Sequence, residues 1–190
     1  MSRQPEVDPG RVWIVGASRG SEAAALVAVR RHDLVHGLVD LSPSATVGCA
    51  YVPAGGGGCA DSAWSAGGKP LPFTVMFDDP VPTDEPRAII PVEEVDGPVL
   101  TLCGGSDLVW ASCASSDAIQ QRLRRHGSRF AHLALAYPDA GHGIDLPMPY
   151  LPAAPAALGA LPTYGSTPGA NDVARADAWP KVLDFIRQAR

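Results

Sequence analysis

Four short, mainly apolar runs, each followed by turn-forming residues, constrain the fold of this chain more than any other feature. The runs cover residues 12–15, 34–41, 98–103 and 130–137, and they are followed by Gly16, Ser42-Pro43, Gly104-Gly105 and Pro138, respectively. Apolar runs of four to eight residues between turn residues are typical of strands that are buried on both faces of a sheet. Such strands need helices on both sides to cover them.

Three further segments have the composition of helices. Residues 19–31 are rich in alanine, residues 115–126 end before Gly127, and residues 172–189 contain Pro180, which we expect to interrupt or kink the last helix. The alternation of strands and helices predicts an α/β fold, in which a mostly parallel sheet of about four strands is flanked by helices. In such folds the functional residues follow the carboxyl ends of the strands.

The chain has the size and composition of one domain. It contains 190 residues, of which 46% are hydrophobic and 18% are charged, and this is enough apolar material for a packed core. Glycine and proline are concentrated in residues 43–97 and 138–169. We interpret residues 43–97 as an excursion from the fold and residues 138–169 as a second long loop.

Charge and hydropathy argue against two kinds of partner. The formal net charge is −5, whereas nucleic-acid-binding domains are normally basic. No stretch approaches the roughly 18 uncharged apolar residues that a membrane helix needs, and the first residues lack the apolar run of a signal peptide. We therefore expect a cytoplasmic protein that binds neither nucleic acid nor a membrane.

The four cysteines contain no C-x-x-C pair. In a reducing cytosol, free thiols are the simplest expectation for Cys49, Cys59, Cys103 and Cys113. A disulfide between Cys49 and Cys59, across a Gly-rich loop, is the alternative that the sequence leaves open.

A G-x-S-x-G motif follows the first predicted strand and opens the first predicted helix, at residues 16–20. This is the context of a nucleophile elbow, in which a sharp turn raises a serine hydroxyl above the sheet. Ser18 is then the candidate nucleophile, and the Arg19 N–H is the candidate donor of an oxyanion hole. A plain Gly-rich turn and a phosphate-binding turn remain the alternatives for this motif alone.

A serine nucleophile needs a base and an acid that orients the base. Asp107 follows the third predicted strand and His142 follows the fourth, so the order along the chain is Ser, Asp, His, as in α/β-hydrolases. Asp40, near the end of the second strand, is the alternative acid. The other four histidines fall on predicted strands or helix ends, where packed or solvated roles are more common.

Four arginines form a basic run near the end of the second predicted helix: Arg122, Arg124, Arg125 and Arg129. They could bind a substrate phosphate. A solvated face that complements the helix dipole is the interpretation we favour.

The chain resembles the C-terminal α/β-hydrolase domain shared by type I acyl-CoA thioesterases and bile acid-CoA:amino acid N-acyltransferase. The stretches that carry the resemblance are VDPGRVWIVGASRGSEAAAL, LVDLSPS, DSAWSAGGKPLPF, IPVEEVDGPVLTLCGGSDLVWASC, YPDAGHGI and STPGANDVARADAWPKVLDFIR. The resemblance implies Ser18 as nucleophile, Asp107 as acid and His142 as base. It also implies an acyl thioester such as an acyl-CoA as substrate. Because the N-acyltransferase branch typically has cysteine in the elbow, Ser18 favours hydrolysis.

One departure from this family concerns the start of the chain. Family members carry an N-terminal β-sandwich and the first half of the hydrolase sheet before the elbow strand, so residues 1–190 correspond to a partial α/β-hydrolase domain. Residues 12–15 would then lie at an open sheet edge, which invites pairing with another chain. We expect a homodimer, a companion chain, a longer polypeptide or a degraded remnant. The second oxyanion donor, which comes from the missing part of the sheet, would also be absent.

The resulting functional expectation is a serine hydrolase that cleaves acyl thioesters through an acyl-serine intermediate, without a metal or organic cofactor. An oxygen-ester or dienelactone hydrolase is one alternative, and a non-catalytic fragment or interaction module is another. Trp64, Leu71 and Phe73 in the excursion could cover the acyl site or form a small apolar cluster of their own.

Overall fold

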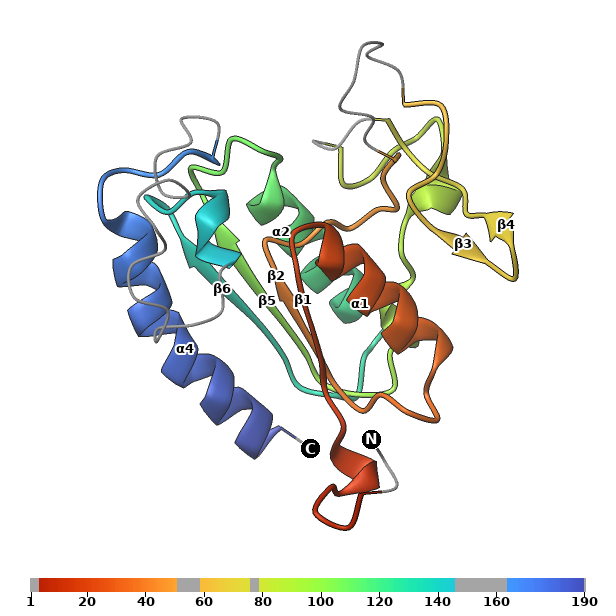
Figure 1. The fold of residues 1–190 in the computed structure, drawn as a ribbon, viewed down its shortest axis with the longest axis horizontal. Coiled ribbons are helices and arrows are strands. Elements are labelled where there is room, and N and C mark those ends of the chain that lie inside the picture. Colours follow the sequence, from red (N-terminus) through yellow and green to blue (C-terminus); the bar gives the residue numbers. More distant parts are fainter. Residues whose placement is uncertain (1–3, 51–58, 76–78, 146–163, 190) are drawn as a thin grey trace.

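The computed structural model of the chain describes residues 4–50, 59–75, 79–145 and 164–189. Its centre is a parallel four-stranded sheet in the order β1-β2-β5-β6. The strands are Ile14–Ala17 (β1), Leu38–Leu41 (β2), Val99–Gly104 (β5) and His132–Tyr137 (β6). Figure 1 shows their carboxyl ends at the top of the sheet. This architecture confirms the predicted α/β fold.

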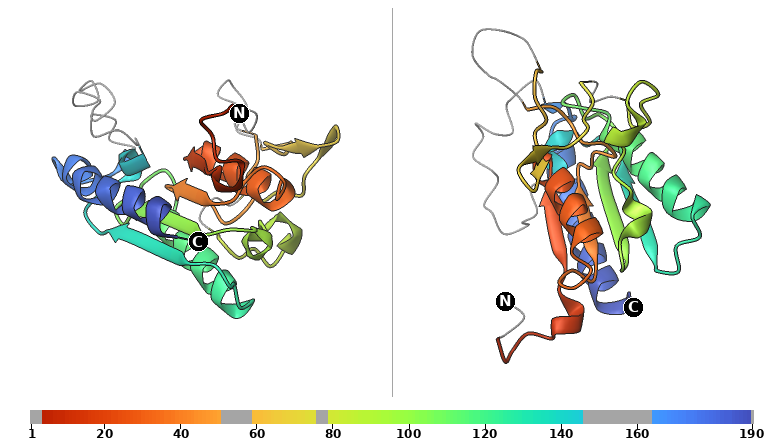
Figure 2. Two further views of the ribbon diagram at one scale, coloured as in Figure 1. Left: turned by 90° about the horizontal axis from the view of Figure 1, so that it is seen from below. Right: turned by 90° about the vertical axis from the view of Figure 1, so that its right-hand side faces the viewer.

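Three helices cover the two faces of the sheet: α1 (Arg19–Arg30), α2 (Ser112–Arg125) and α4 (Ala170–Gln188). Residues of α1 and α2 pack in one core cluster with Leu38 and Val99, while residues of α4 pack in the other with Val39 and Leu100. Neighbouring residues of one strand thus face opposite layers, as the pleat requires. The layers are visible in Figure 2, where α4 lies on one side of the sheet and α2 on the other. None of the described helices combines the length and the apolar character needed to cross a bilayer.

Pro180 was expected to interrupt or kink the last helix, and the interruption is not found, because α4 continues through it from Ala170 to Gln188. Proline lacks an N–H, so one intrahelical hydrogen bond is missing at this point. The side chains of Ala174, Ala178 and Val182 are buried against the sheet. Burial on both sides of Pro180 therefore holds the helix together where propensity alone would end it.

The elements in the described part of the excursion at 43–97 are short. A hairpin joins β3 (Ser65–Ala66) to β4 (Lys69–Pro70) through two glycines with positive φ. The 3-10 turns η2 (Pro86–Ala88) and η3 (Val92–Glu94) follow; η1 (Pro9–Arg11) and η4 (His142–Asp145) lie elsewhere.

Three apolar side chains of the excursion, Trp64, Leu71 and Phe73, pack against the core cluster on the α1 and α2 side of the sheet. They extend the main core, so they do not form a small cluster of their own. Residues 51–58 and 76–78 of the excursion, and residues 146–163 of the second predicted loop, lie outside the described residues.

The expectation of free thiols is wrong for this structure, which contains the disulfides Cys49–Cys59 and Cys103–Cys113. The Cα atoms of these pairs are 5.5 and 5.1 Å apart, which is within the range that a disulfide spans. Sequence spacing left the first pair open. It did not suggest the second pair, which the fold creates by bringing the end of β5 beside the first turn of α2.

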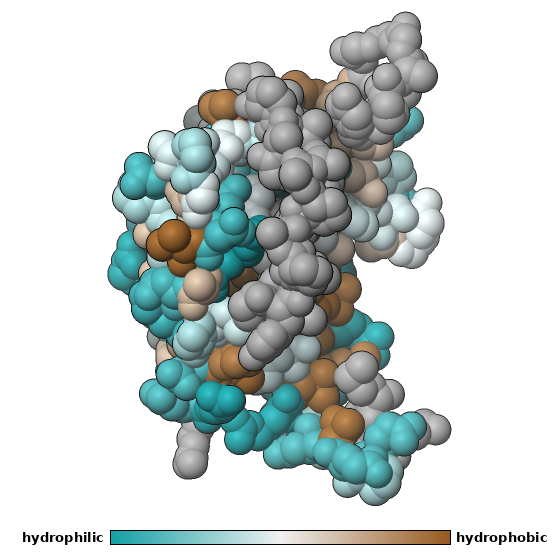
Figure 3. Space-filling model, turned by 60° about the vertical axis from the view of Figure 1, so that its left-hand side comes forward, coloured by the Kyte–Doolittle hydropathy of each residue, from teal (hydrophilic) through white to brown (hydrophobic). Residues whose placement is uncertain are grey.

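Large hydrophobic residues are exposed at eight described positions: Val15, Val27, Leu34, Val75, Val81, Leu108, Val109 and Val173. On the face drawn in Figure 3, hydrophobic residues lie in separate groups among hydrophilic ones. Val15 is the member of this set that belongs to the sheet, and its strand β1 forms one edge of the described sheet.

Candidate active site

Ser18 sits in a strained turn between β1 and α1. Its φ and ψ are 54° and −126°, outside the regions that a residue with a side chain normally occupies. The Ser18 N–H donates to the Leu41 carbonyl at 2.9 Å, which ties the turn to the end of β2. Strained residues of this kind persist where the surrounding structure fixes them, and they cluster at functional sites.

The two glycines of the motif have different roles. A Cβ on Gly16 would lie 2.2 Å from the Gly20 carbonyl oxygen and 2.6 Å from the Ala24 Cβ, so β1 and α1 can cross closely only with glycine there. A Cβ on Gly20 would meet no atom within 4 Å. Gly16 is therefore the glycine of the motif whose surroundings leave no room for a side chain.

The structure brings Ser18, His142 and Asp107 into one hydrogen-bonded row. Ser18 Oγ lies 2.7 Å from His142 Nε2, and His142 Nδ1 lies 2.8 Å from Asp107 Oδ2. The side chains of His142 and Asp107 are only 4% and 1% exposed. Because a carboxylate can only accept, Nδ1 donates to Asp107 and Nε2 is left to accept the serine proton.

Asp107 is held by its own loop, which follows β5. Its second oxygen, Oδ1, accepts from the N–H groups of Val109 at 2.9 Å and Trp110 at 3.3 Å. Oδ1 thus bonds to the loop backbone while Oδ2 bonds to His142, so the loop fixes the direction in which Oδ2 points. A local turn of this kind is a common use of an aspartate side chain.

His142 lies between two aromatic rings that sequence reasoning did not assign to the site. Trp110 meets the imidazole edge to face at 4.7 Å, and Tyr164 stacks on it at 5.7 Å. Trp110 is itself oriented by its indole N–H, which donates to the Pro43 carbonyl. Trp110 stands three residues after Asp107, a spacing that could have identified it. No sequence signal identifies Tyr164.

Asp40, the alternative acid, is buried in the sheet and away from the row. Within the described part of the chain, neither of its carboxylate oxygens has a hydrogen-bond partner. Burial raises the pKa of Asp40 well above its ordinary value. The geometry therefore pairs the imidazole with Asp107 rather than with Asp40.

Arg19 opens α1 directly after the serine, so its N–H lies at the positive end of the helix. Its side chain turns to the excursion, where the guanidinium donates to the Glu22 carboxylate and to the Cys49 carbonyl. This neutralises the charge of Arg19 beside the elbow. Among the described residues there is also no cluster of three or more side chains that could hold a metal ion.

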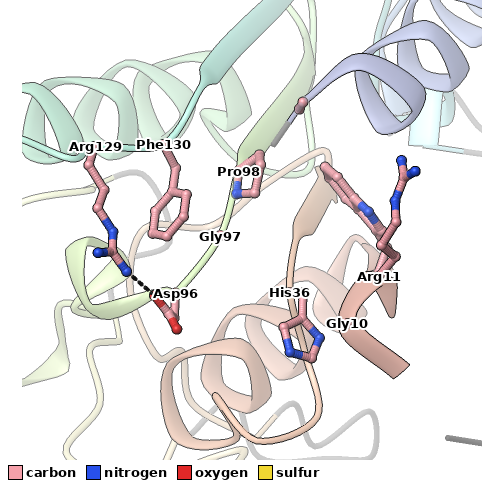
Figure 4. Close-up of a pocket in the computed structure, with 10 residues that line it drawn as sticks. Gly10, Arg11, His36, Asp96, Gly97, Pro98, Arg129 and Phe130 are labelled. Carbon is pink, nitrogen blue, oxygen red and sulfur yellow. Dashed lines mark hydrogen bonds and ion pairs between the residues drawn. The ribbon is translucent and has the colours of Figure 1, made fainter. Parts of the chain in front are cut away.

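A cavity of about 510 Å³ lies at the amino ends of the strands, the opposite end of the sheet from Ser18. Figure 4 shows Arg129 paired with Asp96 on one side of it and Arg11 on the other, with Phe130 and Pro98 between them. One member of the basic run thus lines a cavity remote from the hydrogen-bonded row. Arg122, another member, pairs with Glu93. Neither arginine is placed to bind a substrate at Ser18.

Comparison with known proteins gives a family match and several relatives. The family model described as "BAAT / Acyl-CoA thioester hydrolase C terminal" matches residues 62–190. "Acyl-coenzyme A thioesterase 6" from Mus musculus is 27% identical over 99% of this chain and 46% of its own length. "Acyl-coenzyme A thioesterase 2, mitochondrial" from the same species is 36% identical over 56% of this chain and 24% of its own length. The chain thus spans less than half the length of these relatives.

Among solved structures, the chain is similar to a putative dienelactone hydrolase from Klebsiella pneumoniae. The TM-score is 0.52 with 18% sequence identity, over 95% of this chain and 53% of the other. At this identity the similarity supports the α/β-hydrolase fold alone.

Proposed function

Because the chain belongs to the BAAT / acyl-CoA thioester hydrolase C-terminal family, we propose that it carries the active site of a serine hydrolase that cleaves acyl thioesters. The observation that carries this proposal is the hydrogen-bonded row from Ser18 through His142 to Asp107. The same row in other folds activates a serine for acyl transfer. The relatives named above are acyl-CoA thioesterases, which supports an acyl-CoA as the substrate.

The proposed reaction has two steps. In the first, His142 Nε2 takes the Ser18 proton while Oγ bonds to the thioester carbonyl carbon. The Arg19 N–H stabilises the oxyanion, the C–S bond breaks, and the departing thiolate receives the proton from His142. In the second, His142 takes a proton from water as the water oxygen bonds to the acyl carbon. The acyl–Oγ bond then breaks, Ser18 regains its proton, and a carboxylic acid leaves.

The experiment that tests this proposal is labelling with a fluorophosphonate probe, which reacts with activated serines. Wild type is expected to label at Ser18, and Ser18→Ala is expected to lose both labelling and acyl-CoA hydrolysis. Ser65→Ala, in the exposed β3 strand, serves as a matched control and should label like wild type. Hydrolysis by Ser18→Ala at the wild-type rate would rule the proposal out.

Substrate class is a separate part of the proposal, since the same row can cleave oxygen esters. We propose a thioester because of the family, and a comparison of an acyl-CoA with a short aryl ester on one preparation tests this choice. A kcat/KM for the aryl ester well above that for every acyl-CoA tried would favour the oxygen-ester alternative.

We also propose that the outer edge of β1 pairs with a further β-strand, supplied by a second copy or by another chain segment. β1 has β2 as its one neighbour in the described sheet, and its Val15 side chain is 47% exposed. Unpaired apolar edges favour the addition of a strand. In α/β-hydrolases a second oxyanion donor comes from the loop after a strand on that side, so the added segment would also complete the oxyanion hole.

A further inference from the structure

A buried carboxylate lies one helical turn from the elbow and takes no part in the hydrogen-bonded row. The Glu22 side chain is 0% exposed. Its Oε1 accepts from the Arg19 guanidinium at 2.6 Å. Its Oε2 accepts from the Gly48 N–H at 2.9 Å and from the Trp64 indole N–H at 2.8 Å. The Glu22 side chain therefore connects the first turn of α1 to two segments of the excursion, at Gly48 and at Trp64.

Around the Glu22 contact, residues of the excursion pair with one another. Gly48 and Cys49 make isolated bridges to Thr74 and Ser62, and the Gly48 carbonyl accepts from Ala63. The Arg19 guanidinium donates to the Cys49 carbonyl beside the same point. The Glu22–Arg19 pair thus fastens the excursion to the first turn of α1 by hydrogen bonds from both of its members.

The electrostatics of this arrangement depend on both partners. Burial raises the pKa of Glu22, while the hydrogen bond from Gly48 and the charge of Arg19 act in the opposite direction. An isolated buried carboxylate would be strongly disfavoured, and the hydrogen bonds from Gly48 and Trp64 together with the Arg19 guanidinium reduce that cost for a charged Glu22. In turn, Glu22 fixes the side chain of the residue whose N–H is proposed to hold the oxyanion.

We infer that Glu22 is a positioning residue of the proposed acyl-transfer site, which acts through Arg19 to hold the elbow turn and is itself held in place by its hydrogen bonds to the excursion. This inference rests on the proposed function. The strained Ser18 and the Arg19 N–H lie at the start of α1, whose first turn Glu22 ties to the excursion, and strain of this kind needs surrounding contacts to maintain it. The Glu22 side chain accepts from Arg19, Gly48 and Trp64 and lies outside the row of Ser18, His142 and Asp107, so its effect on the reaction is exerted through the backbone.

The test uses two substitutions that weaken the same link. Glu22→Gln keeps the size of the side chain but removes its charge and one acceptor oxygen. Arg19→Lys keeps the backbone N–H and the positive charge but loses the guanidinium, whose two terminal nitrogens donate to Glu22 and to the Cys49 carbonyl. Each is expected to slow fluorophosphonate labelling of Ser18 about tenfold per folded molecule, and to lower kcat for thioester hydrolysis with a smaller change in KM.

The double variant distinguishes one interaction between Glu22 and Arg19 from two independent losses of folding stability. If Glu22 acts through Arg19, the Glu22→Gln/Arg19→Lys variant should label about as slowly as either single variant, because both remove one interaction. Glu93→Gln is the matched control. It removes another Glu–Arg pair, between Glu93 and Arg122, and should leave the labelling rate per folded molecule unchanged.

The outcomes distinguish this inference from the proposed function. Absence of labelling in wild type would overturn the proposed function and the positioning role together. If wild type labels but Glu22→Gln labels at the same rate per folded molecule, the positioning role is overturned and the proposed function stands. Fully additive effects of the two substitutions would overturn it as well.

Discussion

Gly16 leaves no room for a side chain at the crossing of β1 and α1. Gly16→Ala places a methyl group against the Gly20 backbone, which cannot move without shifting the first turn of α1. Overpacking of this kind typically costs about 1–3 kcal/mol, and we expect a loss of unfolding free energy in that range together with slower labelling of Ser18. Urea denaturation followed by circular dichroism measures the first effect.

Gly20→Ala is the control for this prediction, since its methyl group would enter open space. Alanine is also favoured over glycine in a helix by about 0.5–1 kcal/mol, so this variant should be at least as stable as wild type. Equal destabilisation by the two substitutions would contradict the different roles assigned to the two glycines.

Asp40 gives a prediction about pH. Its pKa is raised by burial in the folded chain, so above the unfolded value of about 3.9 the unfolded chain releases a proton that the folded chain retains. Stability is therefore lost as the pH rises above that value. Asp40→Asn removes this loss and should raise the unfolding temperature at pH 7, with a smaller difference from wild type at pH 4. Equal shifts at both pH values would show that Asp40 does not titrate in this way.

The residues that sequence reasoning could place are those that follow strand ends. Ser18, Asp107 and His142 each lie in the turn or loop that follows an apolar run, and parallel strands bring such positions to one edge. The structure places these three side chains in contact. Tyr164 and the partners of Glu22 could not be placed, because their positions depend on how loops far apart in the sequence fold against each other.

At the scale of elements, the Cys103–Cys113 disulfide ties the end of β5 to the first turn of α2 across the loop that carries Asp107. Closing a loop of this length removes conformational entropy from the unfolded chain worth about 2–3 kcal/mol. Cys113→Ala should lower the unfolding free energy by about that amount under non-reducing conditions. Denaturation with and without dithiothreitol measures it.

Cys59→Ala, which opens the other disulfide, is the matched comparison for this prediction. Wild type should lose stability on reduction, and each single variant should lose less than wild type. An unfolding free energy of wild type that is the same with and without the reductant would contradict a structural role for both bridges. Disulfides persist mainly in oxidising compartments, so the two bridges do not support a cytoplasmic location, which stays a prediction.

The type and order of the main elements followed from hydrophobic runs, but their boundaries did not. The run at 34–41 yields a strand only at Leu38–Leu41, because the preceding residues form a turn in which the Leu34 and Val35 N–H groups donate to Arg31. Likewise α2 begins at Ser112, before the predicted residue 115. Backbone hydrogen bonds, such as those of this local turn, set the ends of elements, and an apolar pattern carries no information about them.

At the scale of the whole molecule, the open edge of β1 predicts association. If a second copy pairs there, Val15→Lys should shift the chain toward monomer in sedimentation velocity, because a charge on an edge strand opposes pairing. Val173→Lys, at a position on α4 that is 71% exposed, introduces the same charge away from the edge and should not change the distribution. A wild-type chain that is monomeric at all concentrations would exclude the second copy as the source of the strand.

The proposed acid, Asp107, and the proposed base, His142, follow the neighbouring strands β5 and β6, and the segments around them are joined directly: the Ser106 N–H donates to the Ala140 carbonyl, and Asp107 forms a β-bridge with Gly165. The proposed nucleophile, Ser18, follows β1, which lies two strands away from β5, and its Oγ meets His142 at Nε2. Replacing the Ser18 oxygen with sulfur would present a thiol to an imidazole that Asp107 already orients, so a change of nucleophile would not require rebuilding the rest of the row.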